Sequence, residues 1–413
     1  MPRPAESNLT DDWYTPAFHA DPYPYYDVVR NVAPVIWSES EQGWVVTGYE
    51  QVTHILRDPE RFSSAGRMAA LLNRLPAGDR GHFQPIYDHF SGGMIRSDPP
   101  DHTRLRQLIN TTFTPRVIQK SRADIEMTMR SLFDRFEADQ SVDLVSEFAF
   151  PLPATVICRM LGVPTDDLEQ VRDWTLRINS VVAGALPLRQ AAEEMQTALV
   201  ELQDYYHAMI AQRRQSPRED LMSLLVAAEE EGERLTEAEL LSTAENLLAA
   251  GHETTTNLIA NTVLTLLRHP EQWQRLAKHP AGIPQAVEEV LRYESPLQRQ
   301  TRIVKQDMTF HGQSMRQGQI VFLMIGAANR DPAAFVDPNC FDIERTDNRH
   351  LAFGVGVHFC IGAPLARLEG KLALEALLRE FPKMQLASDH HQWSPTAALR
   401  GPVSLPVRLE NDR

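Results

Sequence analysis

The chain has 413 residues and is acidic: 55 Asp and Glu residues outnumber 41 Lys and Arg residues, which gives a formal net charge of −14. Such a chain repels a phosphate backbone, so we expect no general nucleic-acid binder. Its three cysteines are widely spaced, which excludes a disulfide framework and is typical of a reducing, cytoplasmic compartment. A hydrophobic content of 43% is ample for a large core.

The N-terminal residues predict neither a signal peptide nor a membrane anchor. Residues 1–7 contain no apolar run. No stretch of about 18 uncharged apolar residues, the least that would span a bilayer, occurs in the chain. Residues 1–30 are rich in Pro and Tyr, and we expect them to form a surface segment. We therefore expect no association with a membrane.

Hydrophobic patterns change in a clear order along the chain. Residues 34–48 indicate two short strands. Residues 63–98 contain Gly, Met and Leu and are expected to be rich in loops. From about 103 to 290 helical patterns dominate, and strand-like runs return at 301–325.

The last 25 residues hold another strand-like pair, around Val403 and Val407. Together these patterns predict a mainly α protein with small β-sheets near both ends. No linker or change in composition marks a second domain, so we expect a single domain over residues 1–413.

The clearest predicted helix runs from Thr236 to about His269. Thr236 and Glu239 have the spacing of a capping box, and Pro270 ends the pattern. At 1.5 Å per residue, such a helix is roughly 50 Å long. It is expected to cross the whole molecule.

The middle of this helix, residues 249–257, is weak by helix propensity. Gly251 costs about 1 kcal/mol relative to Ala in a helix interior, and the threonines that begin at Thr254 are β-branched. Such a weakness indicates a groove for a ligand, or a bend in which the Thr254 hydroxyl donates to the carbonyl of Ala250. A threonine hydroxyl can also donate one hydrogen bond while accepting another, and the adjacent Glu253 can exchange protons with water.

Cys360 lies in a glycine-rich loop, residues 351–366, with the sequence LAFGVGVHFCIGAPLA. The glycines allow a large flat group to approach the backbone. Pro364 and the leucines after it predict a helix whose N-terminus favours an anion and lowers the pKa of the thiol. A thiolate presented in this way suits an axial ligand of haem iron. The alternatives are a buried unreactive thiol and a zinc site with His358, for which about four ligands are needed.

The pattern Phe353-Gly-x-Gly-x-His-x-Cys-x-Gly362 resembles the haem-binding loop of the cytochrome P450 family. The resemblance implies haem b (iron protoporphyrin IX) as cofactor, with the Cys360 thiolate as the iron ligand. It places Phe353 and Gly354 in contact with the cofactor. It also implies the fold of the family, one helix-rich domain with the long helix over the haem.

The segment Ala250-Gly-His-Glu-Thr-Thr255 is similar to the oxygen-binding groove of the same family. The resemblance implies that Ala250 and Gly251 lie beside the cofactor, where a missing side chain leaves room for dioxygen. It also implies that Glu253 and Thr254 form the catalytic acid–alcohol pair that delivers protons.

Glu289 and Arg292 lie three residues apart in a predicted helix and so share one face. Their position upstream of the cysteine loop resembles the buried Glu–Arg pair of the family. The resemblance implies a structural role, in which the pair holds the segment that leads to the loop.

Haem carries two propionates, which require cationic or hydrogen-bonding partners. His102 and Arg106 lie four residues apart on one predicted helical face and resemble the family's propionate-binding pair. Arg302 matches a third propionate contact, although Arg299 competes for the role. His358, just before Cys360, fits a fourth.

The family's substrate specificity comes from the loop before the propionate-binding helix, a mid-chain hairpin, the long helix and two late strands. At these places the chain carries apolar side chains, which imply an apolar substrate. Macrolides, terpenoids, steroids and fatty acids all fit. The candidate pocket residues are Met94, Leu186, Leu247, Leu297 and Leu399.

The resemblance implies a soluble, bacterial-type monooxygenase that hydroxylates or epoxidises an apolar small molecule. Since no flavin domain or cysteine cluster is present in the sequence, we expect electrons from NAD(P)H to arrive through a ferredoxin reductase and a ferredoxin. We expect a monomer. Two alternatives are a peroxygenase that uses hydrogen peroxide, against which the retained Glu253–Thr254 pair argues, and a non-catalytic haem sensor or carrier, which would need an output domain.

Overall fold

The computed structural model describes Trp13 and residues 15–110, 113–137, 141–184, 186–230 and 235–409. Helices dominate this part of the chain, as predicted, and three small sheets accompany them. The α-helices are α1 (Pro16–Ala20), α2 (Tyr23–Val32), α3 (Tyr49–Arg57), α4 (Arg67–Leu72), α5 (Gln84–Phe90), α6 (Asp101–Asn110), α7 (Pro115–Phe133), α8 (Pro151–Leu161), α9 (Leu168–Ile178), α10 (Ser180–Ala183), α11 (Leu188–Gln215), α12 (Leu221–Glu230), α13 (Glu237–Leu267), α14 (Pro270–Lys278), α15 (Ile283–Tyr293), α16 (Ile325–Ala328) and α17 (Ala363–Glu380).

The largest sheet has five strands in the order β1-β2-β8-β5-β3, and it joins segments from both ends of the chain. The predicted strands at 34–48 and 301–325 are confirmed, and β1, β2, β5 and β8 from these two runs belong to this sheet. Only the β2–β8 pair is parallel, and every residue of β8 is buried. The strands are β1 (Val35–Ser38), β2 (Gly43–Val46), β3 (Phe62–Ser63), β5 (Arg299–Val304) and β8 (Ile320–Met324).

Two smaller sheets complete the β structure. One is the hairpin of β6 (Met308–Phe310) and β7 (Gln313–Met315). The other has the order β4-β10-β9, with β4 (Ser141–Asp143), β9 (Gln385–Leu386) and β10 (Pro406–Arg408). The predicted C-terminal strand pair is therefore wrong in its partner: Val407 lies in β10, but β10 pairs with β4 and β9, and Val403 lies in no strand.

Two further expectations need correction. The segment 63–98 is not mainly loop, because it folds into α4, α5 and short 3₁₀ turns. The N-terminal segment does not merely cover the surface, since its aromatic residues are buried in a cluster against β2 and β8. Those aromatic residues are Trp13, Phe18, Tyr23 and Tyr26.

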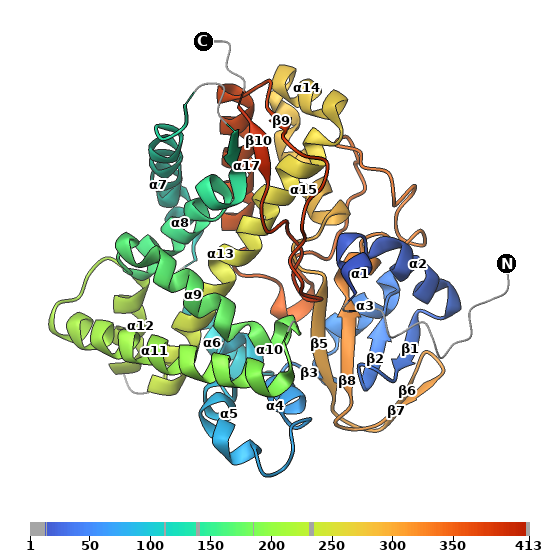
Figure 1. The fold of residues 1–413 in the computed structure, drawn as a ribbon. Coiled ribbons are helices and arrows are strands. Elements are labelled where there is room, and N and C mark those ends of the chain that lie inside the picture. Colours follow the sequence, from blue (N-terminus) through green and yellow to red (C-terminus); the bar gives the residue numbers. More distant parts are fainter. Residues whose placement is uncertain are drawn as a thin grey trace.

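Helix α13 passes through the middle of the molecule, with α8–α12 on one side and the five-stranded sheet on the other (Figure 1). The predicted capping box is confirmed: the Thr236 side chain accepts from the Glu239 N–H, and Glu239 reaches back to the N–H of Thr236. Its first half, up to Leu248, belongs to one apolar core, and its second half, from Leu258, to another. The weak segment predicted at 249–257 thus lies between two packed cores.

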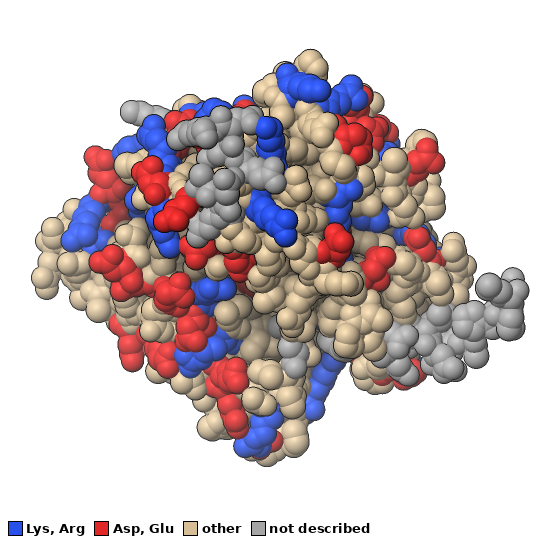
Figure 2. Space-filling view, turned by 45° about the horizontal axis from the view of Figure 1, so that its top comes forward, with Lys and Arg blue, Asp and Glu red and all other residues tan. Residues whose placement is uncertain are grey.

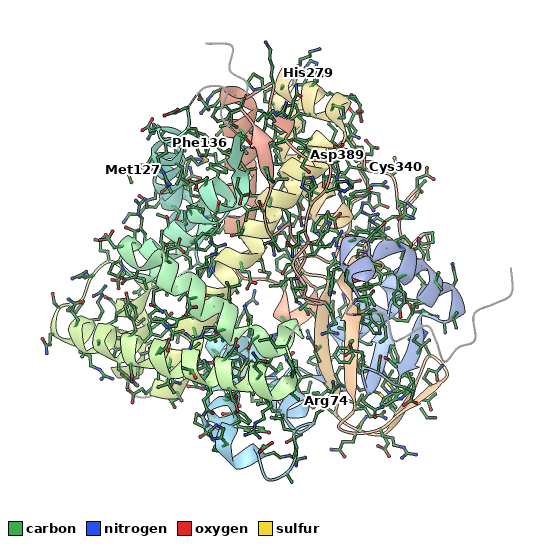
Figure 3. All side chains as sticks on the ribbon, viewed as in Figure 1. Arg74, Met127, Phe136, His279, Cys340 and Asp389 are labelled. Atoms are coloured by element: carbon green, nitrogen blue, oxygen red, sulfur yellow. The ribbon has the colours of Figure 1, made fainter. Side chains whose placement is uncertain are left out.

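Within the described residues, no helix has the length and apolar character to cross a membrane. Acidic and basic side chains are interspersed over the face seen in Figure 2. Of the three cysteines, Cys158 is buried, and Cys340 is exposed at the periphery (Figure 3). Cys360 is the one that the loop geometry singles out.

Candidate active site

The loop around Cys360 is held by backbone geometry that only glycine adopts easily. Gly354 and Gly356 have φ values of 67° and 79°, in the left-handed region. A Cβ at Gly356 would lie 2.6 Å from the carbonyl oxygen of Leu56, so the loop packs directly on the end of α3. The Cys360 N–H donates to the carbonyl of Phe353 at 2.9 Å, which closes the loop.

The Cys360 thiol is accessible to solvent even though protein atoms surround it. Burial raises its pKa, while the backbone N–H of Gly362 and the guanidinium of Arg106 act in the opposite direction. The helix N-terminus therefore acts on the pKa of this thiol in the predicted direction, but desolvation outweighs it, and the net pKa is raised in the chain alone. A metal cation at the sulfur would reverse the balance, since it stabilises the thiolate directly.

The rings of His102, which is buried, and His358, which is half-buried, lie with their centroids 4.1 Å apart. Neither ring nitrogen of His102, nor Nε2 of His358, has a hydrogen-bond partner among the described residues. Buried polar atoms without partners are rare in native proteins. Such a pair therefore points to a ligand that can accept hydrogen bonds.

Cations surround the histidine pair. The pKa of His358 is lowered to about 3, first by burial and then by the charges of Arg302 and its neighbours His102 and Arg67. Burial and the repulsion of Arg302 likewise lower the pKa of Arg67 to about 9. Asp98 is the one carboxylate that opposes these shifts, and it is itself bound by Ser63 and Ser64. This donor set fits the two carboxylates of a haem.

The structure places Arg299 and Arg302 on different faces of β5. Arg302 is buried near His358, and its Nη1 donates to the carbonyl of Thr301 at 2.8 Å. Arg299 instead forms an ion pair with Glu41 at 3.3 Å and lies over the ring of Phe322. Arg302 rather than Arg299 thus joins the histidine pair.

Arg106 connects α6 to the cysteine loop. Its Nη1 donates to the carbonyl of Phe359 at 2.6 Å, one residue before Cys360. Sequence reasoning did not place Arg67 in this group, because its position four residues after β3 carries no pattern that predicts proximity to β5. Only the packing of α4 against β5 brings it there.

In the middle of α13, Ala250 is exposed although Leu247, Leu248 and His252 around it are buried. Gly251 does not supply this opening. A Cβ at Gly251 would lie 2.7 Å from Cγ1 of Ile157, so the missing side chain allows α13 to pack closely on α8. The expectation that Gly251 leaves room for dioxygen is therefore wrong, and Ala250 is the residue of this segment that faces solvent-accessible space.

The Thr254 hydroxyl donates to the carbonyl of Ala250 at 3.0 Å. The sequence predicted this local bond to the backbone as the alternative to a groove for a ligand. The bond uses the single hydroxyl proton and leaves the oxygen able to accept from another donor. Local bonding and a role in proton delivery are thus compatible at Thr254.

The Glu253 carboxyl accepts a hydrogen bond of 2.6 Å from Nδ2 of Asn179. Burial raises the pKa of Glu253 to about 7, and the Asn179 bond only partly opposes this. A carboxyl with this pKa takes up and releases protons near neutral pH. Asn179 was not predicted from the sequence, because it lies 74 residues away, at the end of α9.

Glu289 and Arg292 are fully buried and make two hydrogen bonds of 2.8 Å to each other. Arg345 is a third member, with Nε 3.2 Å from Glu289. Arg292 also donates to the carbonyls of Pro338 and Cys340. The predicted contact is confirmed, and it ties α15 to the segment that precedes the cysteine loop.

The candidate pocket residues fall into two groups. Met94 and Leu247 are buried in one apolar cluster, against which Leu186 and Ile361 pack. Leu297 and Leu399 form a separate bridge between two late segments. Three of the five thus belong to, or pack against, the same apolar cluster as Ile361, the residue that follows Cys360.

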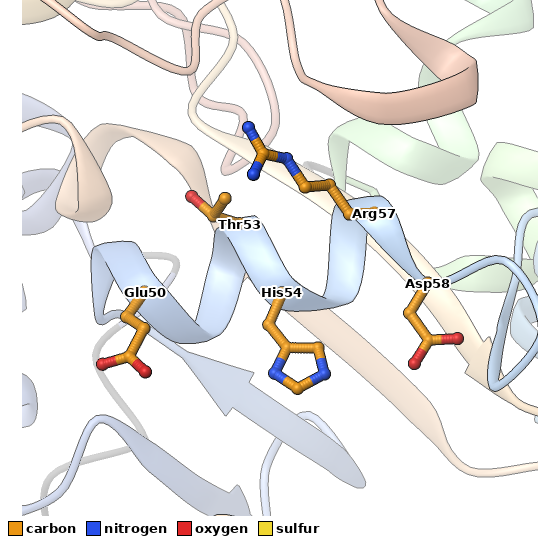
Figure 4. Close-up of a pocket in the computed structure, with 5 residues that line it drawn as sticks. All are labelled: Glu50, Thr53, His54, Arg57 and Asp58. Carbon is orange, nitrogen blue, oxygen red and sulfur yellow. The ribbon is translucent and has the colours of Figure 1, made fainter.

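Two other features of the structure do not form a comparable site. An open surface pocket on α3 contains none of the predicted site residues (Figure 4); Glu50, Thr53, His54, Arg57 and Asp58 line it. Across the described ranges, no three His, Cys, Asp or Glu side chains are arranged to hold a metal ion. The zinc alternative at Cys360 and His358 therefore lacks ligands.

Comparisons with known proteins identify the family of the chain. The family model described as "Cytochrome P450" matches residues 34–279 and 283–402. The chain is 38% identical to a "Biotin biosynthesis cytochrome P450" of Bacillus subtilis (strain 168), over 95% of this chain and 97% of that protein. Two solved structures are similar along the whole length. One is CYP109E1 from Bacillus megaterium in complex with testosterone, with a TM-score of 0.88, 35% identity, and coverage of 96% of this chain and 99% of that one. The other is P450BioI in complex with an acyl carrier protein ligated to hexadec-9Z-enoic acid, with a TM-score of 0.85, 38% identity, and coverage of 95% and 100%.

Proposed function

We propose that this chain, which belongs to the cytochrome P450 family, hydroxylates or epoxidises an apolar small molecule. It is a P450 monooxygenase, and the family implies haem with a cysteine thiolate ligand. The observation that carries the assignment to this site is the contact of His102 with His358, in which three buried ring nitrogens have no hydrogen-bond partner among the described residues: both of His102 and Nε2 of His358.

Cys360 would ligate the iron of haem b, and His102, Arg106, Arg302 and His358 would bind the propionates. The support is the donor set itself, which combines two cations, Arg106 and Arg302, with ring nitrogens of His102 and His358 that lack hydrogen-bond partners among the described residues. Bound haem supplies the redox-active iron at which dioxygen is activated with two electrons. Phe353 and Gly354 shape the loop around Cys360 and would contact the cofactor there, and Ala250 would contact it from α13.

The chain's own groups would supply the protons. Glu253, with a pKa raised to about 7, exchanges a proton with water near neutral pH. Thr254 accepts a hydrogen bond at its oxygen while it donates to Ala250. This retained pair favours the oxygenase over the peroxygenase alternative.

The substrate is proposed to be an apolar molecule that contacts Met94, Leu186 and Leu247, with Leu297 and Leu399 at a second wall. Two similar proteins were solved with testosterone and with a fatty acyl group on an acyl carrier protein. We therefore propose steroids, fatty acids and carrier-bound acyl chains as the classes to test first. Electrons would come from a ferredoxin and its reductase, docked on the Cys360 side.

The first experiment is the absorption spectrum of the reduced protein under carbon monoxide. Thiolate ligation gives a strongly red-shifted Soret band, and Cys360→His should move the band to the position of His-ligated haem. A wild-type band at the His-ligated position, or no bound haem, would refute the proposal. Substrates are then ranked by the spin-state shift of the ferric protein on titration.

A further inference from the structure

Glu288, the residue before the buried Glu289, faces a different set of partners. Its Oε1 accepts from Nε of Arg367 at 2.7 Å, and its Oε2 accepts from Nη2 of Arg367 at 2.9 Å. Oε2 also lies 3.0 Å from Nε2 of His350. This two-point contact is the geometry in which an Arg–carboxylate pair is strongest.

The His350 ring has only one tautomer that fits its neighbours. Its Nδ1 accepts the backbone N–H of Ala352 at 3.2 Å, so the ring proton lies on Nε2 and is donated to Glu288. The His350 side chain is almost fully buried. Glu288 therefore fixes the segment that enters the cysteine loop.

Arg367 lies on the other side of Cys360, in the second turn of α17. Its guanidinium stacks over the ring of Phe353, 4.5 Å from the ring centroid. Phe353 in turn accepts the N–H of Cys360 at 2.9 Å. A single carboxylate thus holds both arms of the loop, one through His350 and one through Arg367.

The network is also electrostatically defined. Burial alone would raise the pKa of Glu288, but the bonds from His350 and Arg367 outweigh it and lower the pKa to about 2. The Arg367 charge in turn favours the thiolate form of Cys360. Glu288 is therefore ionised at every physiological pH. Its negative charge compensates the positive charge of Arg367, the arginine of α17 nearest to the loop.

We propose that Glu288 and Arg367 are positioning residues for the Cys360 thiolate, with opposite electrostatic effects on the cofactor that it ligates. The inference rests on the proposed haem ligation by Cys360. Glu289 holds the segment that precedes the loop, whereas Glu288 binds the residues on either side of the loop, His350 and Arg367, and contributes a negative charge there. A redox centre responds to such neighbouring charges and hydrogen bonds.

The sign of each effect follows from charge. Reduction adds an electron, so a nearby cation favours the reduced form and a nearby anion disfavours it. Arg367→Gln should lower the midpoint potential of the haem, Glu288→Gln should raise it, and the double variant should return close to wild type. A purely structural role would loosen the loop in both single variants and shift the potential in one direction.

The matched control is the ion pair Arg379–Glu380 on the same helix. It lies 12 residues beyond Arg367, about 18 Å along the axis, where salt screens most of the interaction. Arg379→Gln and Glu380→Gln should leave the potential unchanged. Shifts of one sign in Arg367→Gln and Glu288→Gln, or shifts no larger than those of the controls, would overturn the electrostatic role.

A second measurement tests separately whether Glu288 and Arg367 position the Cys360 thiolate. It also replaces the first measurement if a Gln variant fails to retain haem. Glu288→Asp and Arg367→Lys keep each charge but lose the two-point contact. They should retain the wild-type potential while a larger share of the carbon monoxide complex absorbs at the His-type position. An unchanged share would overturn the positioning role. If wild type itself lacks the red-shifted band, the proposed function fails, which is a distinct outcome.

Discussion

Asn179 and Glu253 join the end of α9 to the middle of α13 through one hydrogen bond of 2.6 Å. The first residue ends a helix in the hairpin expected to contact substrate, and the second is the acid of the acid–alcohol pair. Because the donor is a neutral amide rather than a cation, burial dominates and the pKa of Glu253 stays raised, at about 7.

The raised pKa predicts how stability depends on pH. The folded state binds this proton more tightly than the unfolded state, whose carboxyl has the ordinary pKa of 4.5. The unfavourable contribution of Glu253 is therefore absent below pH 4.5 and grows as the pH rises to about 7. The free energy of unfolding of Glu253→Gln should exceed that of wild type by about 1–3 kcal/mol at pH 8 and should differ little from it at pH 4.5. Urea unfolding across this pH range measures the difference in unfolding free energy, with Glu237→Gln, at an exposed position, as the control. A difference that does not change with pH would contradict the raised pKa of Glu253.

Thr254→Ala should bind haem and substrate like wild type but release more of the consumed oxygen as peroxide. The substitution removes the hydroxyl that bonds to Ala250 and with it the group that accepts and relays a hydrogen bond. Peroxide yield and NAD(P)H coupled to product are measured in a reconstituted assay. Thr254→Ser should restore coupling in large part, and coupling unchanged in Thr254→Ala would remove this residue from proton delivery.

Arg302→Gln should weaken haem retention, whereas Arg299→Gln should not. Arg302 is buried beside His358, while Arg299 is bound to Glu41 and the Phe322 ring. The rate of haem transfer to apomyoglobin measures retention directly. Arg299→Gln is expected to lower only the unfolding free energy, since it leaves the buried Glu41 without its ion partner. Faster haem loss from Arg299→Gln than from Arg302→Gln would reverse the assignment.

Gly251→Ala should destabilise the packing of α13 on α8 without changing the haem spectrum. The added methyl would meet Ile157 at 2.7 Å, an overpacking that costs about 1–3 kcal/mol before the gain of about 1 kcal/mol in helix propensity. A double-mutant cycle with Ile157→Ala should show that the cost disappears when the partner is truncated. A shift in the haem spectrum of Gly251→Ala, together with no energetic coupling to Ile157, would show that Gly251 lies beside the cofactor instead.

Arg292→Ala should unfold or strongly destabilise the protein, by about 3–5 kcal/mol, because it removes both 2.8 Å bonds of the fully buried Glu289 carboxylate and leaves it only the longer contact with Arg345 as an ion partner. The exposed pair Arg275–Glu344 is the matched comparison, and Arg275→Ala should cost less than about 1 kcal/mol. Chemical denaturation of both variants provides the test. Similar losses of unfolding free energy in the two variants would show that the buried pair stabilises the fold no more than the exposed pair does.

Much of the fold could be predicted because its signals are local. The capping box at Thr236 and Glu239 marks the start of α13, and the β-rich runs at 34–48 and 301–325 mark strands. Predictions failed where long-range packing decided the outcome. Val403 has a strand-like neighbourhood but lies in no strand, and β10 pairs with β9 and with β4, which is more than 250 residues away in sequence.

The sequence by itself determined the loop of Cys360, the Glu253–Thr254 pair and the family to which they belong, because each is a short run of residues with fixed spacing. Only the tertiary structure decided which arginine of β5 joins His358, that Gly251 faces Ile157, and that Asn179 and Glu288 reach the site. These facts depend on which faces of separate elements meet. Burial and the distance between charges arise only when those elements pack, and they set the pKa of Glu253 and the charge around Cys360.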